Sequence, residues 1–276
     1  MKFLIQIFSH QPPIKGEFFL SSKLFAVVEV KISVIQFKSE LGAIDKNFDT
    51  AQRLIDGAKN SDVIILPELW TTGYYPAPIE NFADVDANRI KKFICKLARE
   101  NNLNIIGGST IAAVDGKFFN RCIISNRHGE IVSTYDKTHL FSFADEGKVF
   151  TAGKNFSTFE LDGVKCGVAI CYDLRFPEFI RKLALSKIEI LFIPAAWSLK
   201  RLMPRQILTK ARAIENQIFI VFANSAGKSE IVNPLGEVIA ESDIGEEILT
   251  ADIDFNFRAE VIAKMNLIAD RNIFVD

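Results

Sequence analysis

The chain has 276 residues, with 33 lysines and arginines against 34 aspartates and glutamates. Hydrophobic residues make up 49% and charged residues 24%, as in ordinary globular proteins, which excludes long disordered or fibrous segments. The formal charge of −1 argues against binding of nucleic acid or of a membrane surface, because either partner needs a basic field or patch. Four cysteines are too few for a disulfide framework in a chain of this length, so we expect reduced thiols and a cytoplasmic protein.

Residues 1–29 do not share the pattern of the rest of the chain. The apolar run after Lys2 is shorter than the core of a signal peptide, and no cleavage site of small residues follows it. Nowhere do about 18 apolar residues run together, as a membrane span requires. Regular alternation of polar and apolar residues begins at Val30. We therefore expect residues 1–29 to be an appendage outside the fold and residues 30–276 to form one domain, because no linker rich in Pro, Gly or Ser divides them.

Predicted strands and helices follow one another from Val30 onward. In the first half, apolar patterning predicts strands over 30–37, 62–67, 104–113, 118–125 and 130–135, with helices over 46–59 and 86–100. In the second half, it predicts a strand ending at Asp162, strands over 164–170, 188–193, 217–223 and 247–254, and helices from Pro177 and over 204–216. Turn sequences at 115–116, 162–163 and 233–236 separate neighbouring strands. This mixture of βα alternation and hairpins predicts an α/β protein with two mixed β-sheets and helices on their outer faces.

Several common kinds of site are missing from the sequence. The histidines do not have the spacing of metal ligands and no two cysteines form a C-x2-C pair, so we expect no metal site. Neither the G-x-S-x-G nor the G-x-G-x-x-G motif occurs. The segment 227–229, Gly-Lys-Ser, looks like the end of a phosphate-binding loop, but Phe222 occupies the position of its first glycine and no helix is predicted after it. We therefore do not expect phosphate binding there.

Three chemically active side chains follow predicted strands. Glu68 comes after the strand 62–67, Lys137 after the strand 130–135, and Cys171 at the end of the strand 164–170. Singly, each has a simple alternative reading, because a lone Cys is usually a small buried hydrophobe and a lone Glu or Lys a solvated charge. Three other cysteines lie inside predicted elements and are assigned such a packing role: Cys95, Cys122 and Cys166. Strand ends are where α/β folds place active-site residues, which favours a functional reading of Cys171.

The segments around these residues resemble the nitrilase superfamily of carbon–nitrogen hydrolases, whose catalytic triad is Glu, Lys and Cys in this chain order. The matching strings are PELW around Glu68, YDKTHLF around Lys137 and CYDLRFPEF around Cys171, with intervals of 69 and 34 residues. The resemblance covers about 30–257 and leaves residues 1–29 without a counterpart. It implies a four-layer α-β-β-α sandwich, assembled as a homodimer through helices that flank the sandwich.

The resemblance also implies a mechanism that needs no metal or organic cofactor. A thiol attacks a carbonyl as the thiolate, and a free Cys has a pKa near ~8.5. No motif places a His beside Cys171, so Glu68 is the natural base for it. Lys137 supplies positive charge for the thiolate and the tetrahedral oxyanion, with the backbone N–H of Tyr172 as a second oxyanion donor. Relatives carry a second glutamate that contacts this lysine, and Glu146 is the best match.

Within the superfamily, the strings DKTHLFSFADE and CYDLRFPEF look most like the ω-amidase branch, which hydrolyses the terminal amide of small 2-oxo acids. Arg175 is a candidate to bind the substrate carboxylate, or else holds the Cys171 loop or a dimer contact in place. Trp197 and Tyr74 either line the substrate pocket or serve as packing residues. His139 is expected to make a local hydrogen bond, not to transfer protons.

Two alternatives to an ω-amidase stay open at this point. One is a hydrolase of nitriles or N-carbamoyl amides with the same triad. The other is a non-catalytic binding protein on the same fold, and the complete set of Glu, Lys and Cys argues against it, because a scaffold has no need of all three.

Overall fold

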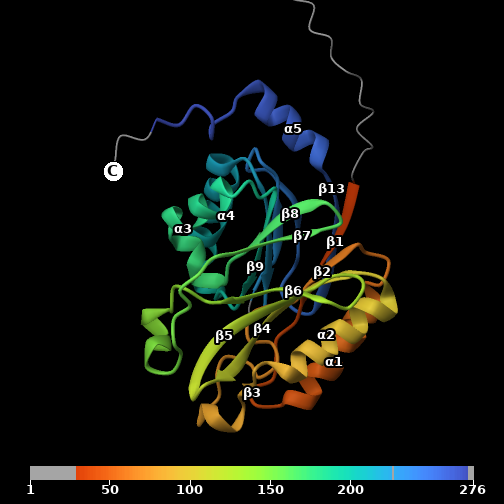
Figure 1. Ribbon diagram of the computed structural model, residues 1–276, viewed down its shortest axis with the longest axis vertical. Helices are drawn as coiled ribbons and strands as arrows, with labels where there is room; N and C mark the ends of the chain where they lie inside the picture. The colour runs from red at the N-terminus through yellow and green to blue at the C-terminus, as the bar shows by residue number, and fades with distance from the viewer. Residues whose placement is uncertain (1–28, 226, 273–276) are drawn as a thin grey trace, which may run out of the picture.

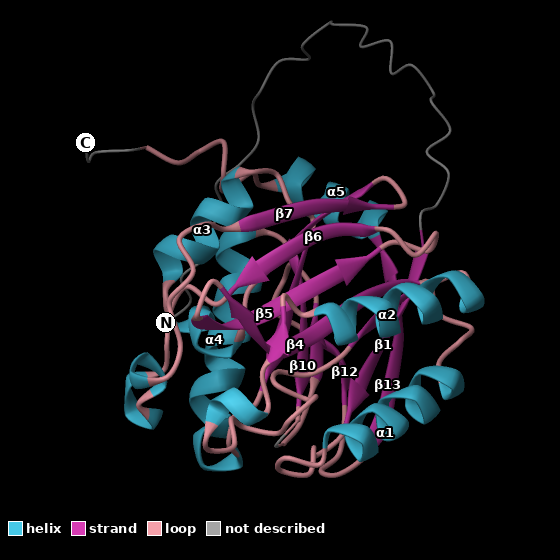
Figure 2. Cartoon of the chain, turned by 60° about the horizontal axis from the view of Figure 1, so that its bottom comes forward, coloured by secondary structure: helices cyan, strands magenta, loops and turns pink. Residues whose placement is uncertain are grey.

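The computed structural model describes residues 29–225 and 227–272. The predicted appendage, residues 1–29, therefore lies outside the described residues except for Glu29, which begins the first strand. Two β-sheets pack face to face, and helices cover the outer face of each sheet (Figures 1 and 2). This arrangement confirms the predicted four-layer α-β-β-α sandwich.

The first sheet is a mixed sheet of seven strands in the order β13-β1-β2-β4-β5-β6, with β3 paired to β4. The central strands β1, β2 and β4 are parallel to one another, whereas β13, β5 and β6 are antiparallel to their neighbours. Its strands are β1 (Glu29–Gln36), β2 (Val63–Ile65), β3 (Asp84–Val85), β4 (Asn104–Val114), β5 (Lys117–Ser125), β6 (Ile131–Asp136) and β13 (Glu247–Asp254). The Asp115-Gly116 turn joins β4 to β5 as expected, and both residues have the positive φ that such a two-residue turn requires.

The second sheet has six strands in the order β12-β11-β10-β9-β8-β7. Its central strands β8, β9 and β10 are again parallel, and the outer strands are antiparallel. Its strands are β7 (Ser157–Leu161), β8 (Val164–Val168), β9 (Ile190–Ala195), β10 (Phe219–Asn224), β11 (Glu230–Val232) and β12 (Val238–Glu241). Each sheet therefore has a parallel centre, and the ends of parallel strands are where α/β proteins place their functional loops.

The helices lie on the outer faces of the two sheets (Figure 2). Those on the first sheet are α1 (Ile44–Gly57) and α2 (Asn88–Asn101), and those on the second are α3 (Pro177–Leu185) and α4 (Leu202–Asn216). Helix α5 (Phe255–Lys264) was not among the predicted elements. Its sequence lacks the apolar periodicity of a packed helix, and Val261 is the one residue that the helix buries. The Asp254 side chain caps it by accepting a hydrogen bond of 2.8 Å from Asn256 N–H.

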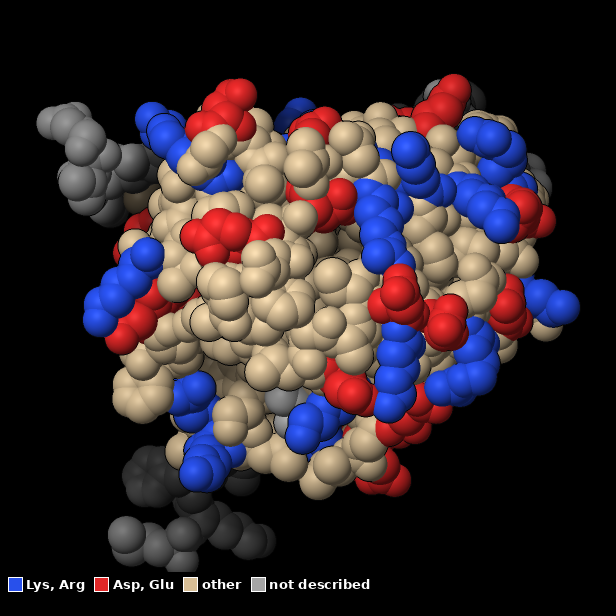
Figure 3. Space-filling model, turned by 90° about the horizontal axis from the view of Figure 1, so that it is seen from below, with Lys and Arg blue, Asp and Glu red and all other residues tan. Residues whose placement is uncertain are grey.

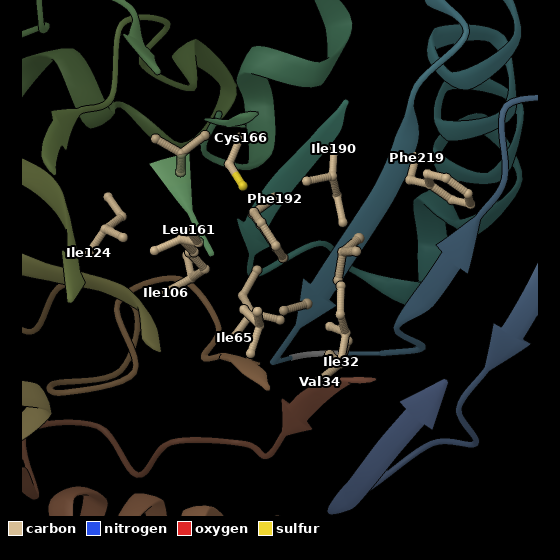
Figure 4. Packing of buried hydrophobic residues seen from close by; sticks show 14 of the residues in the cluster. Ile32, Val34, Ile65, Ile106, Ile124, Leu161, Cys166, Ile190, Phe192 and Phe219 are labelled. Carbon is tan, nitrogen blue, oxygen red and sulfur yellow. The ribbon is translucent and has the colours of Figure 1, made fainter. Parts of the chain in front are cut away.

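The space between the sheets is filled by apolar side chains from both of them (Figure 4). Burial of one Ile or Phe side chain contributes roughly 1.5–3 kcal/mol, so this layer is a major source of stability. Members labelled in Figure 4 are Ile32, Val34, Ile65, Ile106 and Ile124 from the first sheet, and Leu161, Cys166, Ile190, Phe192 and Phe219 from the second. Cys122 and Cys166 belong to this core, where burial raises the pKa of both thiols. The packed layer fixes the two sheets against each other and so fixes the loops at their ends.

The molecular surface carries both signs of charge. On the face shown in Figure 3, basic and acidic side chains lie among one another, so the described residues form no extended basic patch on this face. No helix among residues 29–225 and 227–272 is long and apolar enough to cross a membrane.

Candidate active site

The three predicted strand ends meet at one end of the sandwich. Glu68 lies three residues after β2, Lys137 directly follows β6, and Cys171 comes three residues after β8. Glu68 and Cys171 both line a cavity of about 480 Å³. This volume is within the usual range of about 300–1,000 Å³ for small-molecule sites.

Glu68 is buried, with 2% of its surface exposed. It faces inward because the chain turns directly after it: Leu69 has a φ of +48°, and its N–H donates to Ser109 Oγ at 2.9 Å. Gly108 allows the neighbouring strand to approach this turn, since a Cβ there would lie 2.2 Å from the Pro67 carbonyl oxygen. The segment that carries Glu68 is therefore held by backbone packing.

Both carboxylate oxygens of Glu68 accept hydrogen bonds. Oε1 accepts from Lys137 Nζ at 2.8 Å and from Asn120 Nδ2 at 2.9 Å, and Oε2 accepts from Ala196 N–H at 2.9 Å. Burial raises the pKa of Glu68 and the charge of Glu146 raises it further, against the opposing effect of Lys137. A carboxylate with a raised pKa accepts and returns a proton more readily near neutral pH than an ordinary one.

Lys137 is buried between two carboxylates. Its Nζ donates to Glu68 Oε1 at 2.8 Å and to Glu146 Oε1 at 3.0 Å, and 1% of the residue is exposed. Burial alone would lower the pKa of Lys137, but the charges of Glu68, Cys171 and Glu146 outweigh it and raise that pKa. Lys137 is therefore protonated at neutral pH and is a fixed positive charge in a dry site.

Glu146 is fully buried and joins the loop after Lys137 to the site. Its Oε1 also accepts from the Tyr74 hydroxyl at 2.7 Å, and its Oε2 accepts from Phe141 N–H at 2.8 Å. The carboxylate thus holds Lys137 in place together with Glu68. Burial, followed by the charges of Glu68 and Glu146, raises the pKa of Tyr74, so its phenol remains a hydrogen-bond donor at neutral pH.

Cys171 lies at a sharp turn between a strand and a helical segment. Strand β8 ends at Val168, two residues before the end that the sequence pattern predicted, because Ile170 N–H donates to Asp173 Oδ2 at 2.8 Å and not to a neighbouring strand. Cys171 then opens the 3-10 segment η4 (Cys171–Arg175) with a φ of +46°, a conformation that non-glycine residues rarely adopt and that is concentrated at functional sites. Burial raises the pKa of its thiol, as does the charge of Glu68, while the charge of Lys137 acts to lower it.

Asp173 joins the loop of Cys171 to the loop of Lys137. It is fully buried and accepts four hydrogen bonds. The donors are Ile170 N–H at 2.8 Å, the Tyr135 hydroxyl at 2.7 Å, His139 N–H at 2.9 Å and His139 Nδ1 at 2.7 Å. The His139 ring stacks on Phe176 at a centroid distance of 3.7 Å. His139 is therefore part of this local network and makes the local hydrogen bonds expected from the sequence.

The residues predicted to bind substrate all lie in the cavity wall: Tyr74, Tyr172, Arg175 and Trp197. Trp197 is 5% exposed and also packs against Phe222, so it combines the two roles that the sequence left open. The Arg175 guanidinium lies 4.7 Å from the Trp197 ring centroid and 5.9 Å from that of Tyr172. Its backbone carbonyl accepts a hydrogen bond from Arg212, so the alternative role in holding the Cys171 loop also has a structural basis.

Sequence reasoning missed three residues that shape the site: Asn120, Asp173 and Arg201. Asn120 is a buried polar residue of β5 that lies next to the partly buried Arg121, so the sequence pattern of the strand does not single it out. Asp173 lies two residues after Cys171, where its burial is not evident from its neighbours in the chain. Arg201 lies in the cavity wall, and no motif marks it.

Among the described residues, no group of three or more His, Cys, Asp or Glu side chains could hold a metal ion. The segment 227–229 leads into the strand β11, whereas a phosphate-binding loop would lead into a helix. Lys228 instead pairs with Glu241 at 3.0 Å.

Comparisons with known proteins agree with this geometry. A sequence profile of the carbon-nitrogen hydrolase family matches residues 31–263, and the chain belongs to this family. It is a carbon–nitrogen hydrolase. The chain is 40% identical over 240 residues to the 2-oxoglutaramate amidase of Bacillus subtilis (strain 168), covering 83% of this chain and 93% of that protein.

Two further similarities concern another ω-amidase and a solved structure. The omega-amidase NIT2-B of Xenopus laevis is 29% identical over 255 residues, which is 85% of this chain and 92% of that protein. The crystal structure of a CN-hydrolase superfamily protein from Xanthomonas campestris superposes with a TM-score of 0.84 at 28% identity, over 90% of this chain and 99% of that one.

Proposed function

We propose that this protein is an ω-amidase, which hydrolyses the terminal amide of small 2-oxo acids such as 2-oxoglutaramate and releases ammonia. The proposal rests on one observation above all: a buried chain of charges, Glu68, Lys137 and Glu146, lies beside Cys171 at a cavity with arginines in its wall. The similarity to a 2-oxoglutaramate amidase over most of both chains supports the choice of substrate.

Cys171 is the nucleophile of the proposed reaction. Because burial and the charge of Glu68 raise the pKa of the thiol, the thiol keeps its proton until a substrate arrives. As the sulfur attacks the amide carbon, the proton passes to Glu68 and an S–C bond forms. The developing oxyanion is stabilised by Lys137 Nζ and the backbone N–H of Tyr172, and loss of one such donor typically slows acyl transfer roughly 100- to 1,000-fold.

The tetrahedral intermediate then breaks down to a thioester. Protonated Glu68 returns its proton to the nitrogen, the C–N bond breaks, and ammonia leaves. A water molecule, deprotonated by Glu68, attacks the thioester carbon, and the S–C bond breaks to release the carboxylic acid and the Cys171 thiol. Each proton taken up by Glu68 is returned, so the cycle is balanced without a metal or an organic cofactor.

Substitution of the nucleophile tests this proposal. Cys171→Ala should abolish ammonia release from 2-oxoglutaramate and leave the fold intact, whereas Cys95→Ala, a matched change at the partly buried cysteine in α2, should retain it. Unchanged turnover by Cys171→Ala would refute the nucleophile. Turnover of nitriles or N-carbamoyl amides by the unmodified enzyme, without turnover of 2-oxoglutaramate, would favour the alternative hydrolase instead.

The proposal includes a cytoplasmic homodimer whose catalytic domain spans residues 30–276. All four cysteines are unpaired, which fits a reducing compartment. Exposed apolar side chains on α4 and the adjacent turn support a dimer, because a patch of this kind marks an interaction surface: Met203, Ile207, Ile214 and Leu235. The family match over residues 31–263 supports the domain boundaries.

A further inference from the structure

The cavity wall is rich in positive charge. Among the described residues that line it are three cations, Lys38, Arg175 and Arg201, and one acid, Glu68. Both oxygens of Glu68 already accept hydrogen bonds from protein groups. A ligand that neutralises the cations must therefore bring its own negative charge.

Arg201 is held in place by groups that leave its N–H donors free. It ends the 3-10 segment η5 (Leu199–Arg201), and its carbonyl accepts a hydrogen bond of 2.8 Å from Trp197 Nε1. Its guanidinium lies 5.0 Å from the ring centroid of Phe141 and 5.4 Å from that of Phe143. Aromatic faces attract a guanidinium but accept none of its five N–H bonds in the plane of the group.

Two arginines near Arg201 have carboxylate partners. In α4, Arg205 pairs with Glu230 at 2.6 Å and Arg212 pairs with Glu215 at 3.0 Å. No acid within the described part of the chain forms such a pair with Arg175 or Arg201. Of these four arginines, the two without a carboxylate partner are the two that line the cavity.

We infer that Arg201 is a specificity-determining residue, which binds the carboxylate of the substrate together with Arg175. The cavity then selects amides that carry a carboxylate over neutral amides of the same length. This inference rests on the proposed amidase function and deepens it. The planar fork of a guanidinium matches a carboxylate in a bidentate geometry, whereas Lys38 is an exposed, flexible point charge and contributes less to this selection.

A pair of substrates that differ at one end tests the role of Arg201. Succinamate and butyramide share the reacting amide and the two-carbon spacer, and differ by a carboxylate against a methyl group. The readout is the ratio of kcat/KM for succinamate to kcat/KM for butyramide. Hydrogen bonds to a charged group discriminate by roughly 10- to 100-fold, so Arg201→Met should lower this ratio by that factor, mainly through a higher KM for succinamate.

Two further variants test whether the preference for succinamate depends on the planar guanidinium or only on its positive charge, and whether it depends on this position in the chain. Arg201→Lys keeps the charge without the planar fork and should give an intermediate ratio. Lys200→Met is the matched control, because Lys200 is an exposed neighbour that lies outside the cavity wall, and it should leave the ratio unchanged. If Arg201→Met fails to fold, Arg201→Lys carries the test.

The outcomes for this inference and for the proposed function are distinguishable. A ratio for Arg201→Met within twofold of the unmodified enzyme, or an equal fall in Lys200→Met, would overturn the role of Arg201 and leave the amidase proposal standing. Failure of the unmodified enzyme on 2-oxoglutaramate, with succinamate still preferred over butyramide, would instead refute the proposed 2-oxo acid substrate. If no amide is turned over, the rise in Tm on adding 2-oxoglutarate, the reaction product, decides: it should be smaller in Arg201→Met, and an equal rise would overturn the inference.

Discussion

Replacement of Asp173 by Asn tests whether the buried carboxylate holds the Cys171 loop and the Lys137 loop together. One oxygen of Asp173 accepts from the His139 N–H and ring, and the other accepts from Ile170 N–H and the Tyr135 hydroxyl. An amide has only one oxygen, so in either orientation its NH2 group faces a backbone N–H that needs an acceptor.

The expected loss of stability follows from the number of donors that lose their acceptor. One buried N–H without an acceptor costs about 1–3 kcal/mol, and the remaining hydrogen bonds lose the added strength that a charged acceptor gives. We therefore expect the free energy of unfolding of Asp173→Asn to fall by about 2–4 kcal/mol. In a domain of this size the Tm should fall by roughly 5–15 °C. Since Ile170 precedes Cys171, the proposed nucleophile, kcat should fall more than KM rises.

Urea unfolding followed by circular dichroism, together with ammonia release from 2-oxoglutaramate, measures both effects. Asp243→Asn is the matched control, because this carboxylate is 96% exposed and its loss should change neither quantity. The reasoning is refuted if Asp173→Asn has a free energy of unfolding within about 0.5 kcal/mol of the unmodified protein, the scatter of surface substitutions, and an unchanged kcat.

Two further changes have expected outcomes. Glu146→Gln removes a charge that raises the pKa of Glu68. Glu68, the proposed base, then ionises at lower pH, so the acid limb of the kcat/KM profile should move to lower pH while kcat falls roughly 100-fold. A limb that stays in place or moves upward would contradict this. Ile207→Asp places a charge on the apolar face of α4, where Ile207 is 58% exposed, and should convert the proposed dimer to a monomer in light scattering. Val85→Asp, at a 70% exposed position on β3, should leave the proposed dimer intact.

The sequence was sufficient to predict the sandwich and the residues that meet at its end. Short apolar runs and Asp-Gly turns mark most strands, and the strings around Glu68, Lys137 and Cys171 carry the family resemblance. The end of β8 was wrong by two residues, because the bond from Ile170 to Asp173 competes with the strand ladder and leaves no trace in the apolar pattern.

The residues that were missed act through contacts distant in the chain. Asn120 meets Glu68 across 52 residues, and the hydrogen bonds from His139 to Asp173 span 34. Such pairs depend on the packing of one strand against another, which a single sequence does not specify. Arg201 is recognisable only once the Phe141 and Phe143 rings are seen beside it.

The division of the site between the two sheets has a consequence for how activity arises. Glu68 and Lys137 follow strands of the first sheet, whereas Cys171 and Ala196 follow strands of the second, and Ala196 N–H bonds Glu68 across the boundary. Neither sheet alone contains both the proposed nucleophile, Cys171, and its proposed base, Glu68. By the proposed mechanism, hydrolysis begins only when the sheets have docked, and ammonia release can serve as a reporter of that docking during refolding or fragment complementation.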